Sequence, residues 1–377
     1  MNILFICNEY PPYPSGGIGV FTRELAIELA NSGNNVYIIG LYPTNKKSEE
    51  YIDGIKIIRL PEKRGFLSKI KNRILLYREI KKTIKKNNIQ ILECPDFNGL
   101  LAFTPSLNCK IITRLHGSIY YFNNLLNTNG IKKHIWYFIE KSSIKKSDNI
   151  ISVSKFTSEY TKKIFNLTGD IHTIYNGVTI KNNFSPKAEF NKIKTFIFAG
   201  SLIRKKGIIE LIDAWIKFSS CTPNVKLEIY GKDIENLSLL IENKLNKTNC
   251  HSVTIHPPVD KNLLEKKYIK ADFCIFPTRA EAFSLAPMEA MSMSKVVLYT
   301  NQTSSNELMT NNFNGIIIDK CTPESILDAL INVNNMDIKK YNQISFNAFN
   351  TIYKNFNVID KNIENINFYE KALNNEY

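Results

Sequence analysis

The chain repeats one pattern along almost its whole length: a short apolar run, a polar loop, and a longer stretch with apolar residues at helical spacing. In the first half the apolar runs lie at residues 3–7, 36–39, 55–60, 89–92, 111–115, 149–153 and 171–175, and in the second half at 195–199, 225–230, 253–255, 273–276, 296–299 and 315–318. Short apolar runs that alternate with helices are typical of parallel strands joined by crossover helices. The pattern predicts an α/β fold with two Rossmann-like, doubly wound domains, and a length of 377 residues suits two domains.

The alternation breaks once, at 176–194, where turn-forming and charged residues cluster as in a linker. We therefore expect an N-terminal domain over 1–180 and a second domain over 181–355. The last segment, 356–377, is expected to form a helix that packs back on the first domain. The seven cysteines are scattered and include no C-x-x-C pair, which argues against a disulfide framework and a zinc site.

The stretch 276–290 is the most informative local feature. It follows an apolar strand, and its two acidic residues, Glu281 and Glu289, lie on either side of a predicted helix start near Leu285. The N-terminus of a helix offers free N–H groups that suit a diphosphate, and carboxylates accept hydrogen bonds from sugar hydroxyls. The stretch therefore predicts a nucleotide-sugar site, although Glu289 by itself also fits a carboxylate that only stabilises its helix.

Polar residues follow several of the predicted strands in the first half. A glycine loop, 16–19, comes after the first strand and before a helix, and Glu93, Asp96 and His116 follow later strands. Ligands of open α/β sheets bind beyond the carboxyl ends of the strands, which makes all of these candidate site residues. We favour a site role for His116, while an ordinary loop or capping role stays the alternative for Glu93 and Asp96.

The net charge of +14 indicates an anionic partner, such as nucleic acid, a membrane surface or a phosphorylated substrate. Much of it lies in the segment 63–86, where apolar residues recur at helical spacing: Phe66, Leu67, Ile70, Ile74, Tyr77, Ile80 and Ile84. This segment is either a covering helix with a solvated basic face or a helix that approaches an anionic membrane. No nucleic-acid-binding module is recognisable, so we expect no nucleic-acid partner.

No apolar run reaches the roughly 18 residues of a membrane span, and the N-terminus lacks the features of a signal peptide. We therefore expect a cytoplasmic protein, with the inner face of the cell membrane as a candidate site of peripheral association.

Taken together, these motifs resemble those of the family 4 glycosyltransferases, which are retaining enzymes of the GT-B fold. The resemblance spans nearly the whole chain. Its most specific element is the E-x7-E motif, matched by Glu281 and Glu289; the other matches are Lys206-Gly207, Asn176-Gly177-Val178, the glycine loop 16–19 and His116-Gly117.

The resemblance implies two domains that face each other across a cleft, and it assigns roles to single residues. His116 and Glu281 are implied as catalytic residues. His116 would lie beside the transferring sugar, Glu281 would bind the hydroxyls of that sugar, and Glu289 would bind the hydroxyls of the ribose. The full donor-binding set is Gly17, Arg204, Lys206, Phe283, Ser284, Leu285 and Glu289, and Glu93 and Asp96 are weaker candidates for acceptor binding. The chain has no D-x-D motif, so we expect neither metal nor cofactor, with Lys206 and backbone amides neutralising the diphosphate.

The expected reaction is the transfer of a hexose or N-acetylhexosamine from a nucleotide-sugar to a growing surface glycan. A UDP-sugar is favoured over a GDP-sugar as the donor, and a glycan carried on a lipid is one candidate acceptor. Two alternatives stay open. One is a nucleotide-sugar 2-epimerase on the same scaffold, and the other is a non-catalytic partner protein of the same fold. The second rests on Ser201, which stands where the family often has arginine, and Thr303-Ser304 likewise replace a glycine pair.

Overall fold

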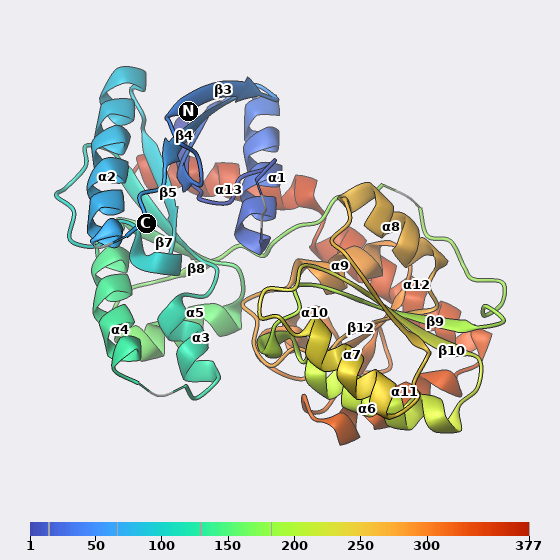
Figure 1. Ribbon diagram of the computed structural model, residues 1–377. Coiled ribbons are helices and arrows are strands. Elements are labelled where there is room, and N and C mark those ends of the chain that lie inside the picture. The colour runs from blue at the N-terminus through green and yellow to red at the C-terminus, as the bar shows by residue number, and fades with distance from the viewer. Residues whose placement is uncertain (14–15, 66, 129, 182, 377) are drawn as a thin grey trace. The chain divides into compact units, whose positions relative to one another are not determined.

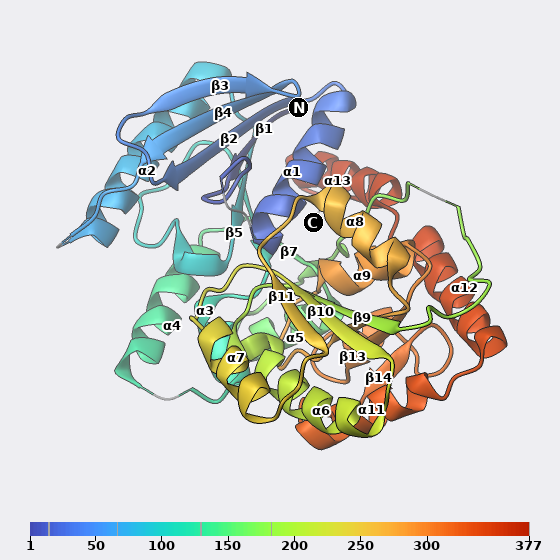
Figure 2. The same ribbon diagram turned by 45° about the vertical axis from the view of Figure 1, so that its right-hand side comes forward.

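The computed structural model describes residues 1–13, 16–65, 67–128, 130–181 and 183–376 (Figures 1 and 2). Phe66 of the basic segment lies outside the described residues. The chain forms two compact units. Unit 1 comprises Met1–Gly177 together with Val358–Tyr377, and unit 2 comprises Val178–Asn357.

Unit 1 is built on a sheet with the strand order β3-β4-β2-β1-β5-β6-β7-β8. The strands are β1 (Asn2–Ile6), β2 (Asn35–Tyr42), β3 (Ser48–Ile52), β4 (Ile55–Pro61), β5 (Ile91–Pro95), β6 (Lys110–Leu115), β7 (Asn149–Ser152) and β8 (His172–Thr173). Only the pair β3 and β4 is antiparallel among the described strand pairs of this sheet. The connecting helices are α1 (Gly17–Asn31), α2 (Ser68–Asn87), α3 (Ile119–Leu125), α4 (Ile131–Ile144), α5 (Lys155–Phe165) and the last helix, α13 (Val358–Leu373).

Successive residues of β1 point to opposite faces of this sheet, and both faces are covered. Ile3 and Phe5 belong to the apolar core shared with α1 and α13, whereas Leu4 and Ile6 belong to the core shared with α2. The continuous apolar run of β1 is thus the pattern of a parallel strand that is buried on both faces.

Unit 2 has a six-stranded, fully parallel sheet with the order β11-β10-β9-β12-β13-β14. Its strands are β9 (Lys194–Ala199), β10 (Val225–Tyr230), β11 (Val253–His256), β12 (Phe273–Phe276), β13 (Val296–Thr300) and β14 (Ile316–Ile318). Its helices are α6 (Ile208–Cys221), α7 (Ser238–Lys247), α8 (Lys261–Lys270), α9 (Leu285–Ser292), α10 (Ser305–Leu308), α11 (Pro323–Asn334) and α12 (Ile338–Asn355). Read in chain order this is the 3-2-1-4-5-6 arrangement of the Rossmann fold, so the predicted fold class is confirmed.

Two local features could not be read from the sequence. The helix α7 begins at Ser238, because the Asp233 carboxylate accepts the N–H groups of Leu237 and Ser238 at 2.8 and 2.9 Å. The hairpin strand β3 was not predicted, because its sequence is mostly polar and exposed.

Only part of the predicted apolar side of α2 packs against the sheet. Leu76, Ile80 and Ile84 are buried against the sheet, whereas Ile70 and Ile74 are exposed. Asn72 is buried in their place, because its amide exchanges hydrogen bonds with the Lys63 backbone.

Candidate functional site

The order of the strands in unit 2 reverses between β9 and β12, and the loops that follow these two strands pack directly on each other. The Arg279 N–H donates to the Lys205 carbonyl oxygen at 2.8 Å. Gly207 adopts a φ of +70°, and a Cβ at this position would lie 1.8 Å from the Pro277 carbonyl oxygen, so only glycine permits the approach. Ligands of this fold bind at such a point, beyond the carboxyl ends of the strands.

Glu281 lies at this junction with its side chain almost fully buried. Its carboxylate forms an ion pair with Lys206 and accepts a hydrogen bond from the Thr278 hydroxyl at 3.2 Å. Burial alone would raise the pKa of Glu281, but the charges of Lys206 and Lys205 outweigh it and lower that pKa. The junction therefore holds one ionised carboxylate with two adjacent cations.

Lys205 is the second cation, and burial lowers the pKa of its ammonium to about 8 even though Glu281 opposes the shift. Thr278 connects the two loops, since its hydroxyl is also within 3.2 Å of the Lys205 carbonyl oxygen. The sequence singled out neither Thr278 nor its hydroxyl. Its only signal was its position, three residues before Glu281 within the 276–290 stretch.

The helix α9 begins just after this junction, with Ser284 at its N-cap position. Phe283 is buried, and its ring centroid lies 5.5 Å from that of Phe356. Glu289 lies one turn into the helix, and its carboxylate is 3.6 Å from the Lys261 ammonium. The structure thus brings Lys206, Glu281 and the start of α9 together within unit 2.

Arg204 and Ser201 belong to the loop that follows β9. Arg204 is exposed, and its backbone N–H donates to the Glu235 carboxylate at 3.0 Å. The Glu281 backbone N–H donates to the Thr303 hydroxyl at 3.3 Å, so one residue of the replaced glycine pair positions the catalytic candidate.

In unit 1, His116 follows β6, and its backbone N–H donates to the Asp96 carboxylate at 2.8 Å. Its ring lies edge-on to Phe21 of α1, with centroids 5.0 Å apart. Burial, with a smaller contribution from the Arg114 charge, lowers the pKa of His116 to about 3. The imidazole is therefore neutral at physiological pH, with one ring nitrogen that can donate a hydrogen bond and one that can accept one.

Two buried carboxyls accompany His116. Burial raises the pKa of Asp96 to about 8 and that of Glu140 to about 7. Glu140 accepts the N–H groups of Ile119 and Tyr120, both at 2.8 Å, and so caps the start of α3. The sequence did not single out Glu140, because it lies in the middle of α4 and its partners lie about 20 residues earlier in the chain.

Glu93, predicted as a weak acceptor-binding residue, has both carboxylate oxygens engaged within unit 1. Arg114 donates to them at 2.7 and 3.0 Å, and the Tyr369 hydroxyl of α13 donates at 2.6 Å. Arg114 also donates to Asn365 of α13 at 2.6 Å. The hydrogen bonds of Glu93 therefore indicate that it helps to attach α13 to the sheet.

Gly17 is the first residue of α1 and is exposed. The carboxylate of Glu9 lies at this helix start and accepts the Gly19 N–H at 2.8 Å. Burial raises the pKa of Glu9, and hydrogen bonds from Gly19 and its neighbours oppose the shift. The amides of the glycine loop thus already bind a carboxyl group, which the sequence did not reveal.

The loop before Gly17 is held by the buried Arg59. Its guanidinium donates to the carbonyl oxygens of Tyr10 and Pro11 at 3.0 and 2.7 Å and lies 4.9 Å from the Tyr13 ring. Arg59 therefore positions the loop that leads to the glycines.

The buried carboxyls predict how the stability of unit 1 depends on pH. In the unfolded chain Asp96 titrates near pH ~4, so between pH ~4 and 8 the folded state binds more protons and the free energy of unfolding falls as pH rises. His116 acts in the opposite sense, but only below pH ~6.5, its unfolded pKa. From pH 7 to 8 the free energy of unfolding should therefore fall by about 1 kcal/mol, and Asp96→Asn should remove most of the fall. Urea titrations at both pH values measure this, and parallel profiles for wild type and variant would refute it.

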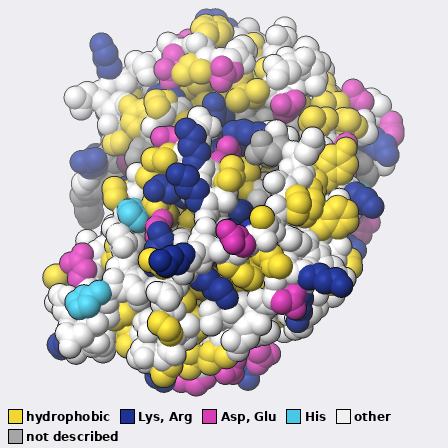
Figure 3. Space-filling view, turned by 90° about the vertical axis from the view of Figure 1, so that its right-hand side faces the viewer, with side chains coloured by type: hydrophobic (Ala, Val, Ile, Leu, Met, Phe, Trp, Pro, Cys, Tyr) yellow, Lys and Arg dark blue, Asp and Glu magenta, His cyan; other side chains and the backbone are white. Residues whose placement is uncertain are grey.

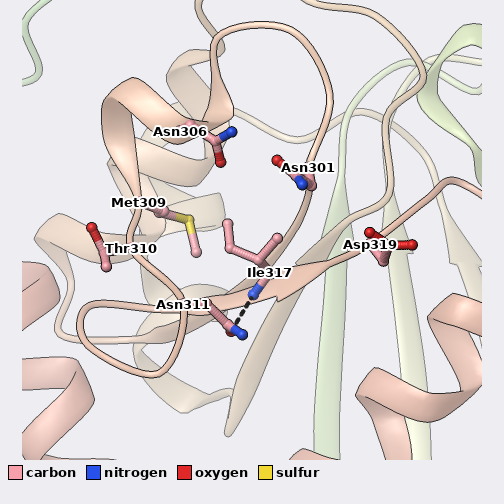
Figure 4. A pocket seen from close by; sticks show the side chains of 7 residues that line it. All are labelled: Asn301, Asn306, Met309, Thr310, Asn311, Ile317 and Asp319. Atoms are coloured by element: carbon pink, nitrogen blue, oxygen red, sulfur yellow. Dashed lines mark hydrogen bonds between the residues drawn. The ribbon is translucent and has the colours of Figure 1, made fainter.

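A separate pocket of about 480 Å³ lies near the end of the unit 2 sheet (Figure 4). It is lined by Asn301, Asn306, Met309, Thr310, Asn311, Ile317 and Asp319. Asn311 shapes it by accepting the Ile317 backbone N–H at 3.0 Å. None of the predicted donor-binding residues lines this pocket.

Within the described part of the chain, no group of three or more His, Cys, Asp or Glu side chains is arranged to hold a metal ion. In the same residues no helix combines the length and the apolar character that crossing a membrane requires.

The chain matches two family models. The model described as Glycosyltransferase Family 4 matches residues 15–182, and the model described as Glycosyl transferases group 1 matches residues 179–351. The two matches together cover most of unit 1 and almost all of unit 2.

Three of the curated relatives with similar sequences illustrate the similarity. The uncharacterized glycosyltransferase MJ1607 of Methanocaldococcus jannaschii is 25% identical over 99% of both chains. MJ1178 of the same organism is 28% identical over 62% of this chain, which spans only 61% of that relative. The O-antigen chain mannosyltransferase RfbU of Salmonella typhimurium is 26% identical over 48% of this chain and 50% of its own.

Two of the solved structures that share the fold cover nearly the whole chain. Sucrose-phosphate synthase from Thermosynechococcus elongatus superposes with a TM-score of 0.84 at 17% identity, covering 98% of both chains. Anabaena Alr3699/HepE, solved in complex with UDP and glucose, has a TM-score of 0.74 at 15% identity and covers 98% of this chain and 100% of its own.

Proposed function

Because the chain belongs to the family 4 glycosyltransferases and has their GT-B fold, we propose that it moves a hexose or N-acetylhexosamine from a nucleotide-sugar to a growing surface glycan. The transfer retains the configuration of the anomeric carbon and uses no metal ion. The observation that carries the proposal is the buried junction of Lys206, Glu281 and Thr278 beside the start of α9.

The donor diphosphate binds where positive charge gathers in unit 2. Lys206 supplies a full charge, the amides of Phe283, Ser284 and Leu285 at the start of α9 supply hydrogen bonds, and the exposed Arg204 reaches the same phosphates. As the sugar–phosphate bond breaks, negative charge grows on the diphosphate, and each such contact contributes roughly 2–4 kcal/mol in the transition state.

The two glutamates hold the hydroxyl groups of the donor. Glu281 is kept ionised by Lys206 and Lys205, and an ionised carboxylate accepts hydrogen bonds from the sugar hydroxyls. Glu289, one turn into α9, accepts hydrogen bonds from the ribose.

For unit 1 we propose that Gly17 lies by the donor phosphates and that the neutral His116 lies beside the transferring sugar. Asp96 is the better of the two acceptor candidates, because both carboxylate oxygens of Glu93 are engaged by Arg114 and Tyr369.

A UDP-sugar is the proposed donor, supported by the UDP and glucose bound to the HepE structure of the same fold. A surface glycan is the proposed product, supported by the similarity to an O-antigen chain mannosyltransferase. We further propose that the acceptor is lipid-linked and that the enzyme works at the cytoplasmic face of the membrane.

The proposal is tested by the thermal stability of unit 2 in the presence of UDP-, GDP- and ADP-sugars. Trp215, buried in the unit 2 core, is the probe in a Trp136→Phe background, and a UDP-sugar at ~100 times its Kd should add about 2.7 kcal/mol to the stability. The gain should vanish in Glu289→Ala. Equal melting temperatures with and without every nucleotide-sugar would contradict the proposal.

Product analysis separates transfer from isomerisation. Incubation with the nucleotide-sugar alone should yield no new nucleotide-sugar, and proton NMR of the transferred sugar should give the anomeric configuration of the donor. Activity that survives EDTA supports the metal-free mechanism, and loss of activity that Mg²⁺ restores opposes it.

A further inference from the structure

We propose that unit 1 docks on anionic membranes through one surface, called here the docking face. Its apolar members are Ile70 and Ile74 of α2, Ile131, Ile135 and Phe138 of α4, and the nearby Phe103. The inference does not rest on the donor site, because every residue of the docking face belongs to unit 1 and none is a proposed donor or acceptor ligand.

The outer side of α2 changes from apolar to basic along its length. Ile70 and Ile74 are 55% and 47% exposed. Arg78, Lys81 and Lys85 continue the same side at spacings of three and four residues, and all three are exposed. The opposite side of the helix packs on the sheet, so the exposed isoleucines contribute nothing to that core.

The outer side of α4 is apolar over its first two turns. Ile131, Ile135 and Phe138 are 83%, 52% and 65% exposed and recur at spacings of four and three residues. Ser142 is the next residue on this side, and its hydroxyl accepts the Phe103 N–H at 3.2 Å. Phe103, itself 71% exposed, therefore extends the apolar side of α4.

Direct contacts join the two helices into one surface. The Lys69 ammonium of α2 lies 5.1 Å from the Trp136 ring of α4. Arg73 donates to the carbonyl oxygens of Asn98 and Gly99, at 2.9 and 3.2 Å, and that short turn packs against α4. Figures 1 and 2 both show α2 and α4 following each other along one edge of unit 1.

The charges of the docking face complement an anionic surface. Each helix contains one acidic residue: Glu79 of α2 is paired with Lys47 at 2.6 Å, and Glu140 of α4 is buried. Apart from Arg73, the lysines and arginines of α2 are exposed, and the one acid on their helix is already paired with Lys47. By contrast, basic, acidic and apolar side chains are mixed on the face shown in Figure 3.

A membrane fits this combination better than a protein partner does. Clustered apolar side chains beside a dense basic stretch are typical of helices that lie in the headgroup region, with apolar residues inserted and lysines reaching phosphates. Trp136, partly buried under Lys69, is of the residue type that prefers the membrane interface. Scattered exposed apolar residues are common on soluble proteins, but five gathered over two adjoining helices, with Phe103 beside them, mark an interaction surface.

The test uses the full chain without nucleotide and vesicles of phosphatidylcholine, alone or mixed with phosphatidylglycerol. The chain has two tryptophans, and Trp215→Phe leaves Trp136 as the only one. Its emission should shift to the blue, and brominated lipids should quench it, with phosphatidylglycerol vesicles at low salt. Ile70→Ser/Ile74→Ser should weaken vesicle binding at least ~10-fold.

The matched control is Ile359→Ser/Ile363→Ser on α13, a pair with the same spacing and with 57% and 53% exposure, which should bind vesicles as wild type does. Equal binding by both double variants, or equal binding to neutral and anionic vesicles, would overturn the docking face. So would self-association or binding to an acidic protein in place of vesicle binding. Because no donor is present, failure here leaves the nucleotide-sugar experiments unaffected.

Discussion

Lys206→Ala is expected to lower the rate of sugar transfer by at least ~100-fold, because it removes the charge that stabilises the departing diphosphate. The same change removes the ion-pair partner of the buried Glu281, which weakens the grip on the donor sugar. Steady-state kinetics with a UDP-sugar measure the effect, which should fall mainly on kcat because the charge develops in the transition state. Glu289→Ala is expected to lose activity by a similar factor.

The matched control for this experiment is Lys244→Ala. Lys244 also pairs with a carboxylate of unit 2, Asp213, at 2.6 and 2.8 Å, but the pair joins α7 to α6 and is partly exposed. Its removal should cost at most about 1 kcal/mol of stability and leave kcat unchanged. Near-normal turnover in Lys206→Ala, with the protein folded, would mean that the diphosphate binds elsewhere.

Arg114→Met is expected to destabilise unit 1 by about 3–5 kcal/mol, because it leaves the buried Glu93 carboxylate without its cation. The substitution should also weaken the attachment of α13, because Asn365 and Tyr369 of that helix are hydrogen-bonded to Arg114, and Tyr369 also to Glu93. Urea unfolding followed by Trp136 fluorescence in a Trp215→Phe background reports on unit 1 alone.

Arg279→Met provides the comparison for Arg114→Met and is followed through Trp215 in a Trp136→Phe background, because Arg279 belongs to unit 2. Arg279 also pairs with a glutamate, Glu210, but its side chain is 44% exposed, so the expected loss is at most about 1 kcal/mol. The double variant Arg114→Met/Glu93→Met should recover much of the stability that Arg114→Met loses, because no unpaired charge stays buried. Equal losses for Arg114→Met and Arg279→Met would show that the buried pair does not hold unit 1 together.

The sequence predicted the strands well because parallel strands are buried on both faces and therefore appear as uninterrupted apolar runs. It failed where that signal is absent. β3 lies at a sheet edge with a mostly exposed, polar sequence, and the start of α7 depends on how the Asp233 side chain bonds. The first turns of α2 misled the prediction, because helical spacing cannot tell an apolar side that packs inward from one that faces solvent.

By itself the sequence determined the fold class and the chemical character of the candidate site, since strand runs, glycines and the two glutamates are local features. Only the tertiary structure showed that Lys206 pairs with Glu281, that Thr278 joins their two loops and that Glu9 lies at the start of α1. It also showed that Glu93, a candidate for acceptor binding, belongs to a buried network with Arg114 and α13. Most of these contacts join residues that are far apart in the chain. Tertiary packing decides which groups become partners and how deeply they are buried, and these two factors set the pKa values of the groups.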